Sequence, residues 1–203
     1  MLSRSERILE NIPVGSLGII PLLGCEELGN KVNDYLVKWR REFHRFPEIG
    51  WSEFWTTSRI ADYLEDLGCF EIFLGKQIIN PDFVRGRKQA VVDKGLANAK
   101  DYGANEKWLE KMEGYTGCVA LFDSGKPGKT IALRFDIDCV NVTETRSSEH
   151  IPNKEGFASI NDGFMHACGH DSHITIGLGV ALWIAQNKDK LTGKVKIIFQ
   201  PAE

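Results

Sequence analysis

The densest group of chemically reactive side chains lies in residues 165–173, MHACGHDSH, which hold three of the chain's five histidines, a cysteine and an aspartate. Thiolate and imidazole are standard ligands of borderline divalent metals. In an extended segment, residues two apart face the same side, so Cys168 and His170 could converge on one ion. A helix beginning near Asp171 would favour the thiolate just ahead of its positive end. The spacing predicts a metal site, and the alternative is a buried cysteine beside histidines that only cap the helix.

Three carboxylates are expected at the ends of strands. Asp136 and Asp138 close the segment KTIALRFDID, and Glu203 follows Pro201 at the end of the apolar segment GKVKIIFQPAE. In open α/β sheets the chemistry gathers at the carboxyl ends of the strands. Metal-bound histidines usually donate their second ring N–H to a carboxylate, a role open to Asp138 or Asp171. Glu203 is placed to act on metal-bound water, whereas exposed strand-end charges are the alternative for both aspartates.

Helices and strands that would position these groups alternate along the chain. Apolar residues at three- and four-residue spacing predict helices, and short apolar runs between turn residues predict strands. Such alternation is typical of an α/β fold, here a mixed sheet flanked by helices. The predicted helices cover 29–45, 52–67 and 174–187, and the predicted strands cover 70–74, 116–124, 129–138 and 193–203.

Local signals refine these elements. Ser52 is a plausible N-cap for the second helix, and Gly68 is the usual residue for a left-handed C-cap. Gly177 and Gly179 are expected to permit close helix packing. The dense apolar run of the last strand is typical of a strand buried on both faces. The apolar stripe of the first helix consists of Val32, Tyr35, Leu36, Trp39 and Phe43.

Composition narrows the class of protein. The chain has 203 residues, of which 42% are hydrophobic and 26% charged, with a formal net charge of −3. These values indicate a globular domain without the basic surface that nucleic acids or anionic membranes require. The start of the chain has charges where a signal peptide would be apolar, and no run reaches the roughly 18 apolar residues of a membrane span. The odd number of cysteines, five, favours a reducing compartment, so we expect a cytoplasmic protein.

The segments RREFHRFPEIGWSEFWTT, IALRFDID, MHACGHDSHITIGLG and VKIIFQPAE resemble, in this order and spacing, the two-metal amidohydrolases of the aminoacylase and carboxypeptidase family. The resemblance is strongest to the branch that holds hippurate hydrolase and the indoleacetyl-amino-acid hydrolases. Within it, the polar region 76–114, with two expected short helices, is similar to an insertion in the aminobenzoyl-glutamate hydrolases. The implied fold is the N-terminal part, residues 1–203, of a zinc-peptidase-like catalytic domain.

The resemblance implies a two-metal centre. Cys168 and His170 would bind manganese or zinc, and Glu203 would be the general base that activates the bridging water. A second glutamate after Glu203, two later histidines and a lid domain that mediates dimerisation are also implied, so we expect the chain to be truncated. Relatives commonly read Asp-Ala-Leu where this chain has Asp138, Cys139 and Val140, which keeps both aspartates but changes the wall beside the metal.

The implied reaction is hydrolysis of the amide bond of an N-acyl or N-aroyl amino acid, with p-aminobenzoyl-glutamate as the expected small-molecule substrate. The expected partner is a second copy or a related B-type subunit, and neither nucleic acid nor membrane is expected. Two other functions stay open. Cys168 and His170 could act as nucleophile and base of a thiol hydrolase. Alternatively, the chain could be a non-catalytic fragment or partner subunit with an incomplete metal site.

Overall fold

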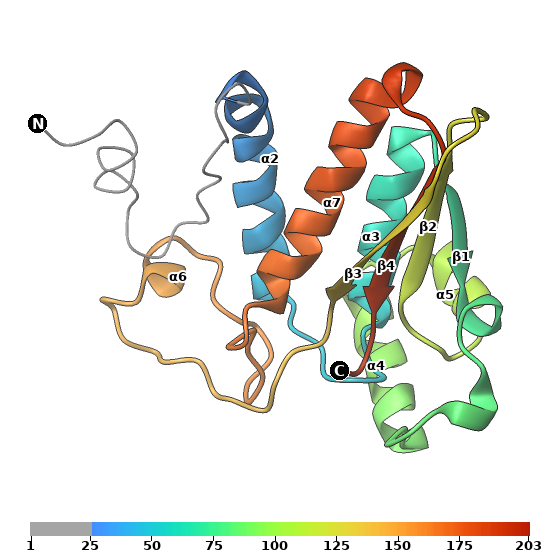
Figure 1. The fold of residues 1–203 in the computed structure, drawn as a ribbon. Helices are drawn as coiled ribbons and strands as arrows, with labels where there is room; N and C mark the ends of the chain where they lie inside the picture. Colours follow the sequence, from blue (N-terminus) through green and yellow to red (C-terminus); the bar gives the residue numbers. More distant parts are fainter. Residues whose placement is uncertain (1–25) are drawn as a thin grey trace, which may run out of the picture.

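The computed structural model describes residues 26–203, with only the backbone for residues 26–32 and 34. The prediction that the start of the chain lacks a signal peptide lies outside these residues. Figure 1 shows one sheet with helices α2, α7 and α3 on one side of it. The expected α/β fold, a mixed sheet flanked by helices, is confirmed. These three helices span Glu26–Arg45, His170–Asn187 and Phe54–Leu67, respectively.

The sheet has four strands in the order β1-β2-β4-β3 (Figure 1). β4 is antiparallel to β2 and parallel to β3, so β2 and β3 are not neighbours although only a short turn joins them. The chain leaves β3, crosses through α7 and returns as β4, which is the connection that parallel strands require. The strands are β1 (Glu71–Leu74), β2 (Cys118–Asp123), β3 (Thr130–Asp136) and β4 (Lys194–Gln200).

The parallel pairing of β3 and β4 places their carboxyl ends at the same edge of the sheet. Asp136, the last residue of β3, pairs with Gln200, the last residue of β4. The chain continues from these ends to Asp138 and Glu203. The expectation that the strand ends gather the carboxylates is therefore confirmed by the topology.

Helix α7 packs against β3 and β4 and also against α2 and α3. Of its two glycines expected to permit close packing, Gly177 clearly does so. A Cβ on Gly177 would lie 2.7 Å from Phe199 Cε1 and 2.9 Å from Phe135 Cδ2, so only glycine lets the helix approach these rings. A Cβ on Gly179 would lie 2.9 Å from the end of the flexible Leu36 side chain.

The helix signals were right in most details. In α2, Leu36, Trp39 and Phe43 are buried, whereas Tyr35 is 54% exposed. The C-cap of α3 is Gly68, with φ 65°, as predicted.

The predicted N-cap of α3 is wrong. The N-cap is Glu53, and Ser52 Oγ instead donates to the Ile49 carbonyl oxygen, 2.7 Å away. Ser52 therefore stabilises the turn before the helix. The side chain of Glu53 makes no hydrogen bond to the first turn of α3.

The prediction that β4 is buried on both faces is also wrong. Ile197 and Phe199 are fully buried against the helices, but Lys194 and Lys196, on the opposite face, are exposed. Among the described residues, helices cover only one face of this strand. No helix within residues 26–203 has the length and apolar character needed to cross a membrane.

Two short helices occur in the region 76–114, as expected: α4 (Gln89–Asp101) and α5 (Glu106–Met112). Both contact α3. The remaining short elements are α6 (Ile151–Lys154) and the 3₁₀ segments η1 (Gly75–Gln77), η2 (Pro81–Phe83) and η3 (Lys188–Lys190).

Candidate metal centre

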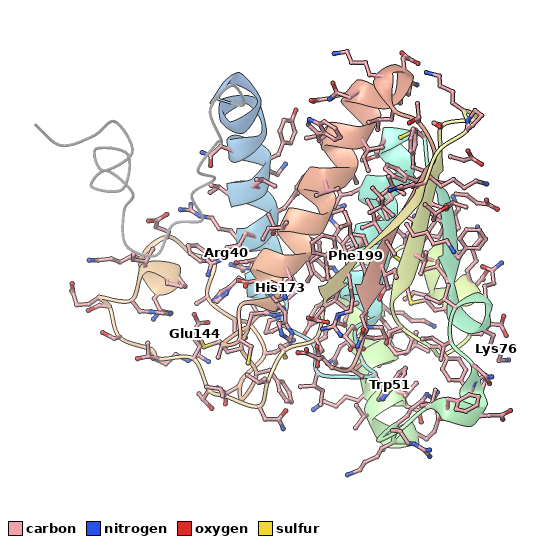
Figure 2. The ribbon with its side chains drawn as sticks, viewed as in Figure 1. Arg40, Trp51, Lys76, Glu144, His173 and Phe199 are labelled. Atoms are coloured by element: carbon pink, nitrogen blue, oxygen red, sulfur yellow. The ribbon has the colours of Figure 1, made fainter. Side chains whose placement is uncertain are left out.

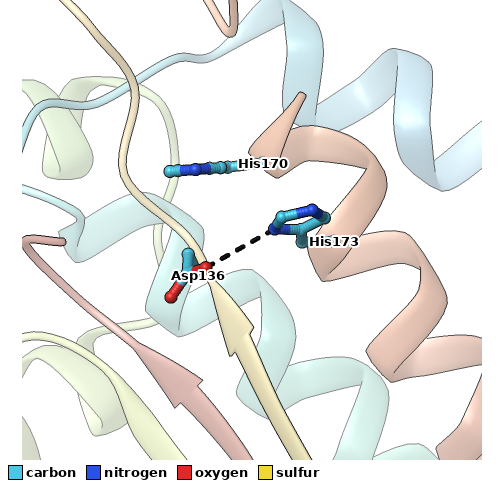
Figure 3. Close-up of side chains that lie close together, drawn as sticks. All are labelled: Asp136, His170 and His173. Atoms are coloured by element: carbon cyan, nitrogen blue, oxygen red, sulfur yellow. Dashed lines mark ion pairs between the residues drawn. The ribbon is translucent and has the colours of Figure 1, made fainter. Parts of the chain in front are cut away.

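Asp136, His170 and His173 gather at the carboxyl edge of β3 and β4. One ligand atom from each lies within 4.8 Å of the others, and this is the one such group of three or more metal-capable residues in the described part of the chain. Because His170 is the first residue of α7, His173 lies one turn later on the same face. Their rings stack with centroids 5.2 Å apart, and His173 Nδ1 is 3.6 Å from Asp136 Oδ2 (Figure 3).

The ring of His170 has a defined orientation. Its Nδ1 lies 2.9 Å from the backbone carbonyl oxygen of Asp138 and 3.2 Å from Oδ1 of the same residue. A carbonyl oxygen can only accept, so Nδ1 carries the proton. In the neutral ring the lone pair is then on Nε2, the nitrogen that faces the site. Asp138 thus lies where the expected orienting role requires it, and that role stays a prediction.

Glu203 reaches the same site from the end of β4. Its Oε2 lies 3.3 Å from His170 Nε2, and its side chain is 47% exposed. Arg134 joins the two strand ends, because its Nη2 donates to Glu203 Oε1 and Asp136 Oδ2, each at 3.1 Å. Its Nη1 donates to Gln200 Oε1, also at 3.1 Å. Glu203 and His170 therefore lie side by side, and the role of Glu203 as general base stays a prediction.

The second carboxylate oxygen of Asp136 has an ion-pair partner but no hydrogen bond in the described part of the chain. Asp136 Oδ1 is buried and accepts no hydrogen bond within the described residues, although Arg134 Nη2 lies 3.0 Å away as an ion-pair partner. Buried polar atoms of proteins nearly always have a partner. Two imidazoles and a carboxylate are donors that suit zinc or manganese. These residues therefore fit a divalent cation.

The extended conformation predicted for the segment before His170 is wrong. Ala167 and Cys168 lie in a turn, and Gly169 has φ 85°, so residues two apart do not face one side. The thiol of Cys168 is free and exposed, and it lies outside the group formed by Asp136, His170 and His173. Its role as a ligand stays a prediction.

His166, from the same segment, is buried and neither ring nitrogen has a hydrogen-bond partner among the described residues. Burial lowers the pKa of His166 to about 4, so the ring is neutral at physiological pH. Its spacing from His170 does not reflect a shared helix, because α7 begins only at His170. The expectation that this part of the segment is a loop is confirmed.

A second polar cluster lies behind the site and was not predicted. His44 is buried, with Nδ1 2.8 Å from Asp171 Oδ2 and Nε2 3.0 Å from Glu144 Oε1. Arg40 Nε is 2.9 Å from Asp171 Oδ2, and His150 Nε2 is 2.7 Å from Glu144 Oε1. Figure 2 shows Arg40 on α2 and Glu144 in the loop that follows β3. The cluster ties this loop to the start of α7.

This cluster changes the protonation of its members. Burial lowers the pKa of His44, but the hydrogen bonds to Asp171 and Glu144 outweigh it and raise the pKa above the ordinary value. No local pattern could have identified these contacts, because 127 residues separate His44 from Asp171 and 100 separate it from Glu144. Asp171 therefore supports His44, whereas Asp138 supports His170.

Part of the chain matches a known protein family. Residues 132–203, which hold the whole candidate site, match the family described as peptidase family M20/M25/M40. The chain is 97% identical over 168 residues to a homolog of the A-type subunit of p-aminobenzoyl-glutamate hydrolase from Haemophilus influenzae, a match that covers 83% of this chain. It is 40% identical over 183 residues to the A-type subunit of p-aminobenzoyl-glutamate hydrolase from Escherichia coli, and 44% identical over 173 residues to indole-3-acetyl-aspartic acid hydrolase of Enterobacter agglomerans.

Solved structures show the same fold. An aminobenzoyl-glutamate utilization protein from Klebsiella pneumoniae matches 89% of this chain with a TM-score of 0.70 and 33% sequence identity. A dinuclear metal-binding peptidase of the M20 family from Bacillus subtilis matches 86% with a TM-score of 0.60 and 29% identity. This chain covers 39% and 36% of these two structures. It also spans only 40%, 39% and 42% of the three curated relatives.

Proposed function

We propose that the chain is part of a metal-dependent amidohydrolase that cleaves N-acyl or N-aroyl amino acids, because residues 132–203 match the model of peptidase family M20/M25/M40. The names of two relatives support p-aminobenzoyl-glutamate as the substrate, and a third relative is named for indole-3-acetyl-aspartic acid. Both substrates in those names join an aromatic acid to an acidic amino acid through an amide bond. The proposed substrate class is therefore aromatic acyl amides of glutamate or aspartate.

One observation carries the metal dependence: Asp136, His170 and His173 converge, and Asp136 Oδ1 is buried without a hydrogen bond among the described residues. These residues would hold manganese or zinc, with Cys168 as a further proposed ligand from the preceding turn. When bound, the cation supplies Lewis-acid polarisation of the amide carbonyl and a lower pKa for its water.

The chain's own residues then handle orientation and proton transfer. Glu203 is the proposed general base, because its carboxylate is half exposed to solvent and lies beside His170. It accepts a proton from the attacking water and returns that proton to the leaving amine. Asp138 keeps the lone pair of His170 on Nε2, and Arg134 holds Glu203 and Asp136 at a fixed separation.

The test uses an extended protein, defined as this chain followed by the part of the Haemophilus influenzae relative that lies beyond the aligned segment. We expect the extended protein to bind about two divalent ions and to hydrolyse p-aminobenzoyl-glutamate. A strong chelator should abolish hydrolysis, and added manganese or zinc should restore it. Absence of both metal and hydrolysis would reject the proposal.

The same assay separates the two alternatives. If Cys168 were the nucleophile of a thiol hydrolase, activity would survive the chelator and disappear in the Cys168→Ser variant. If this chain were a non-catalytic partner subunit, the extended protein would remain inactive with metal present and would gain activity only when a B-type subunit is added.

Three further proposals concern the whole protein. The region 76–114 is an insertion in the catalytic domain, and the protein forms a homodimer or pairs with a related B-type subunit, since two relatives are named as one subunit of a hydrolase. A cytoplasmic location fits the four described cysteines, all of which are free thiols. Light scattering of the extended protein, alone and mixed with a B-type subunit, tests the assembly.

A further inference from the structure

The segment that carries Glu203 makes a sharp turn as it leaves β4. Ala202 has φ 51°, in the left-handed region that non-glycine residues rarely adopt. Such a conformation is strained for a residue with a Cβ and persists only where the surroundings enforce it. A contact that holds Ala202 therefore also determines where Glu203 begins.

Glu53, which is distant from Ala202 in the sequence, supplies that contact. Its side chain is fully buried, and its Oε1 accepts the backbone N–H of Ala202 at 2.8 Å, across 149 residues. Its Oε2 accepts the hydroxyl of the buried Thr116 at 2.6 Å. Gly50, from the same loop as Glu53, lies so close that a Cβ there would be 3.0 Å from Ala202 Cα and Cβ. The loop before α3 thus supports the turn at Ala202.

The carboxylate of Glu53 is not needed to cap its own helix. Although Glu53 is the N-cap of α3, its side chain bonds no N–H of that helix. Glu48 does this instead, since its two carboxylate oxygens accept the N–H groups of Trp55 at 3.1 Å and Thr56 at 2.8 Å. Two buried glutamates in one loop therefore have separate partners.

We infer that Glu53 is a positioning residue, which holds the backbone of Ala202 so that the carboxylate of Glu203 points at the site. This inference rests on the proposed function, in which Glu203 is the general base. Burial raises the pKa of Glu53 to about 7. The contact does not depend on its charge, because Oε1 can accept the Ala202 N–H in the ionised and in the neutral carboxyl group.

The test compares Glu53→Leu with Glu48→Leu in the metal-loaded extended protein. Both variants remove a buried carboxylate of the same loop, but only the first frees the Ala202 N–H. We expect Glu53→Leu to lower kcat by about 10- to 100-fold, since misplacement by about 1 Å can cost 100-fold. KM and metal content should stay close to wild type. Glu48→Leu should lower the melting temperature but change kcat by less than about 3-fold, because it affects the cap of α3 and not the turn.

Two conservative variants keep the inference testable if Glu53→Leu does not fold. Glu53→Gln keeps an oxygen for the Ala202 N–H and should retain kcat within about 3-fold, if the contact acts through geometry. Thr116→Val removes one anchor of Glu53 and should give an intermediate loss. Amide exchange at Ala202 provides a readout without substrate, and it should be faster in Glu53→Leu than in Glu48→Leu.

The outcomes are distinct. The inference is overturned if Glu53→Leu has the same kcat as the unmutated protein. It is also overturned if Glu48→Leu and Glu53→Leu lose kcat to the same extent. If Glu53→Leu does not fold, a wild-type kcat in Thr116→Val or a loss in Glu53→Gln as large as about 100-fold overturns it. Absence of hydrolysis by the unmutated extended protein overturns the proposed function, and this inference with it.

Discussion

Asp138 orients the ring of His170 through two acceptors for the same ring nitrogen. Its backbone carbonyl oxygen lies 2.9 Å from Nδ1, and its carboxylate Oδ1 lies 3.2 Å from Nδ1. The pairing joins the residue two positions beyond β3 to the first residue of α7. It leaves Nε2 of His170 directed toward Glu203. The orientation of the central histidine is thus set before any ligand arrives.

We predict that Asp138→Ala weakens divalent-metal binding by about 10-fold, within the range found when a partner of a metal-binding histidine is removed. The loss should be partial, because the backbone carbonyl oxygen of residue 138 still accepts the hydrogen bond from the Nδ1–H group of His170. Isothermal titration with zinc or manganese measures the affinity. Asp162→Ala, at an 82% exposed carboxylate that pairs only with Arg146 among the described residues, is the control and should bind normally. Equal affinity in both variants would refute the prediction.

A second prediction concerns Arg134, which bridges the ends of β3 and β4. Arg134→Met should lower kcat by about 10-fold, because charge-assisted hydrogen bonds to Asp136 and Glu203 are lost together. Arg134→Lys should recover only part of this loss, since an ammonium cannot reproduce the planar fork. Steady-state kinetics provide the measurement, with the exposed Lys196→Met on β4 as control. A wild-type kcat in Arg134→Met would contradict the bridging role.

A third prediction concerns stability and pH. Burial raises the pKa of Glu48 from its ordinary 4.5 to about 8, although the N–H groups of Trp55 and Thr56 act in the opposite direction. Between these values the folded protein retains a proton that the unfolded chain releases. The free energy of unfolding should therefore fall as pH rises through this window. Glu48→Gln should flatten this fall without removing it, because the raised pKa of Glu53 acts in the same direction.

Urea denaturation of both proteins at about pH 5 and about pH 8 tests this prediction by the difference between the two pH values. In Glu48→Gln the amide nitrogen cannot accept one of the two N–H groups that Glu48 accepts, and this lost hydrogen bond lowers stability by the same amount at both pH values. The difference between the two pH values therefore does not contain it. An unchanged difference in Glu48→Gln would show that Glu48 titrates normally in the folded protein.

A fourth prediction concerns the packing of α7. Gly177→Ala should lower the free energy of unfolding by about 1 kcal/mol, because overpacking against the rings of Phe135 and Phe199 exceeds the roughly 1 kcal/mol gained in helix propensity. Gly179→Ala is the matched control, since it meets only the flexible end of Leu36 and should be neutral or stabilising. Thermal denaturation compares the two, and the reverse order would argue against the packing explanation.

Much of the fold followed from local patterns. Leu36, Trp39 and Phe43 revealed the buried stripe of α2, and Gly68 marked the end of α3. These signals depend on residues within one or two turns of each other. The N-cap of α3 was missed because Ser52 and Glu53 are both polar, and only the turn at Ile49 decides which one begins the helix.

The sequence also predicted part of the candidate site, where local position along strands and helices determines which residues meet. His170, Asp138 and Glu203 could be expected to converge, because strand ends and helix starts meet at one edge of a parallel pair. Asp136 and His173 were not chosen as ligands, since their convergence depends on the first turn of α7 lying over the end of β3. Contacts between distant segments, such as His44 with Asp171, leave no periodic signal in a single sequence.

The most direct test of the metal centre is metal analysis of the extended protein and three histidine variants after equilibration with zinc or manganese. The unmutated protein and His150→Ala, which alters a histidine of the neighbouring cluster, should retain stoichiometric metal. His170→Ala should lose metal and amide hydrolysis together, and His173→Ala should weaken both. Equal metal content in all four proteins, with hydrolysis intact in His170→Ala, would contradict the assignment of the metal to this edge of the sheet.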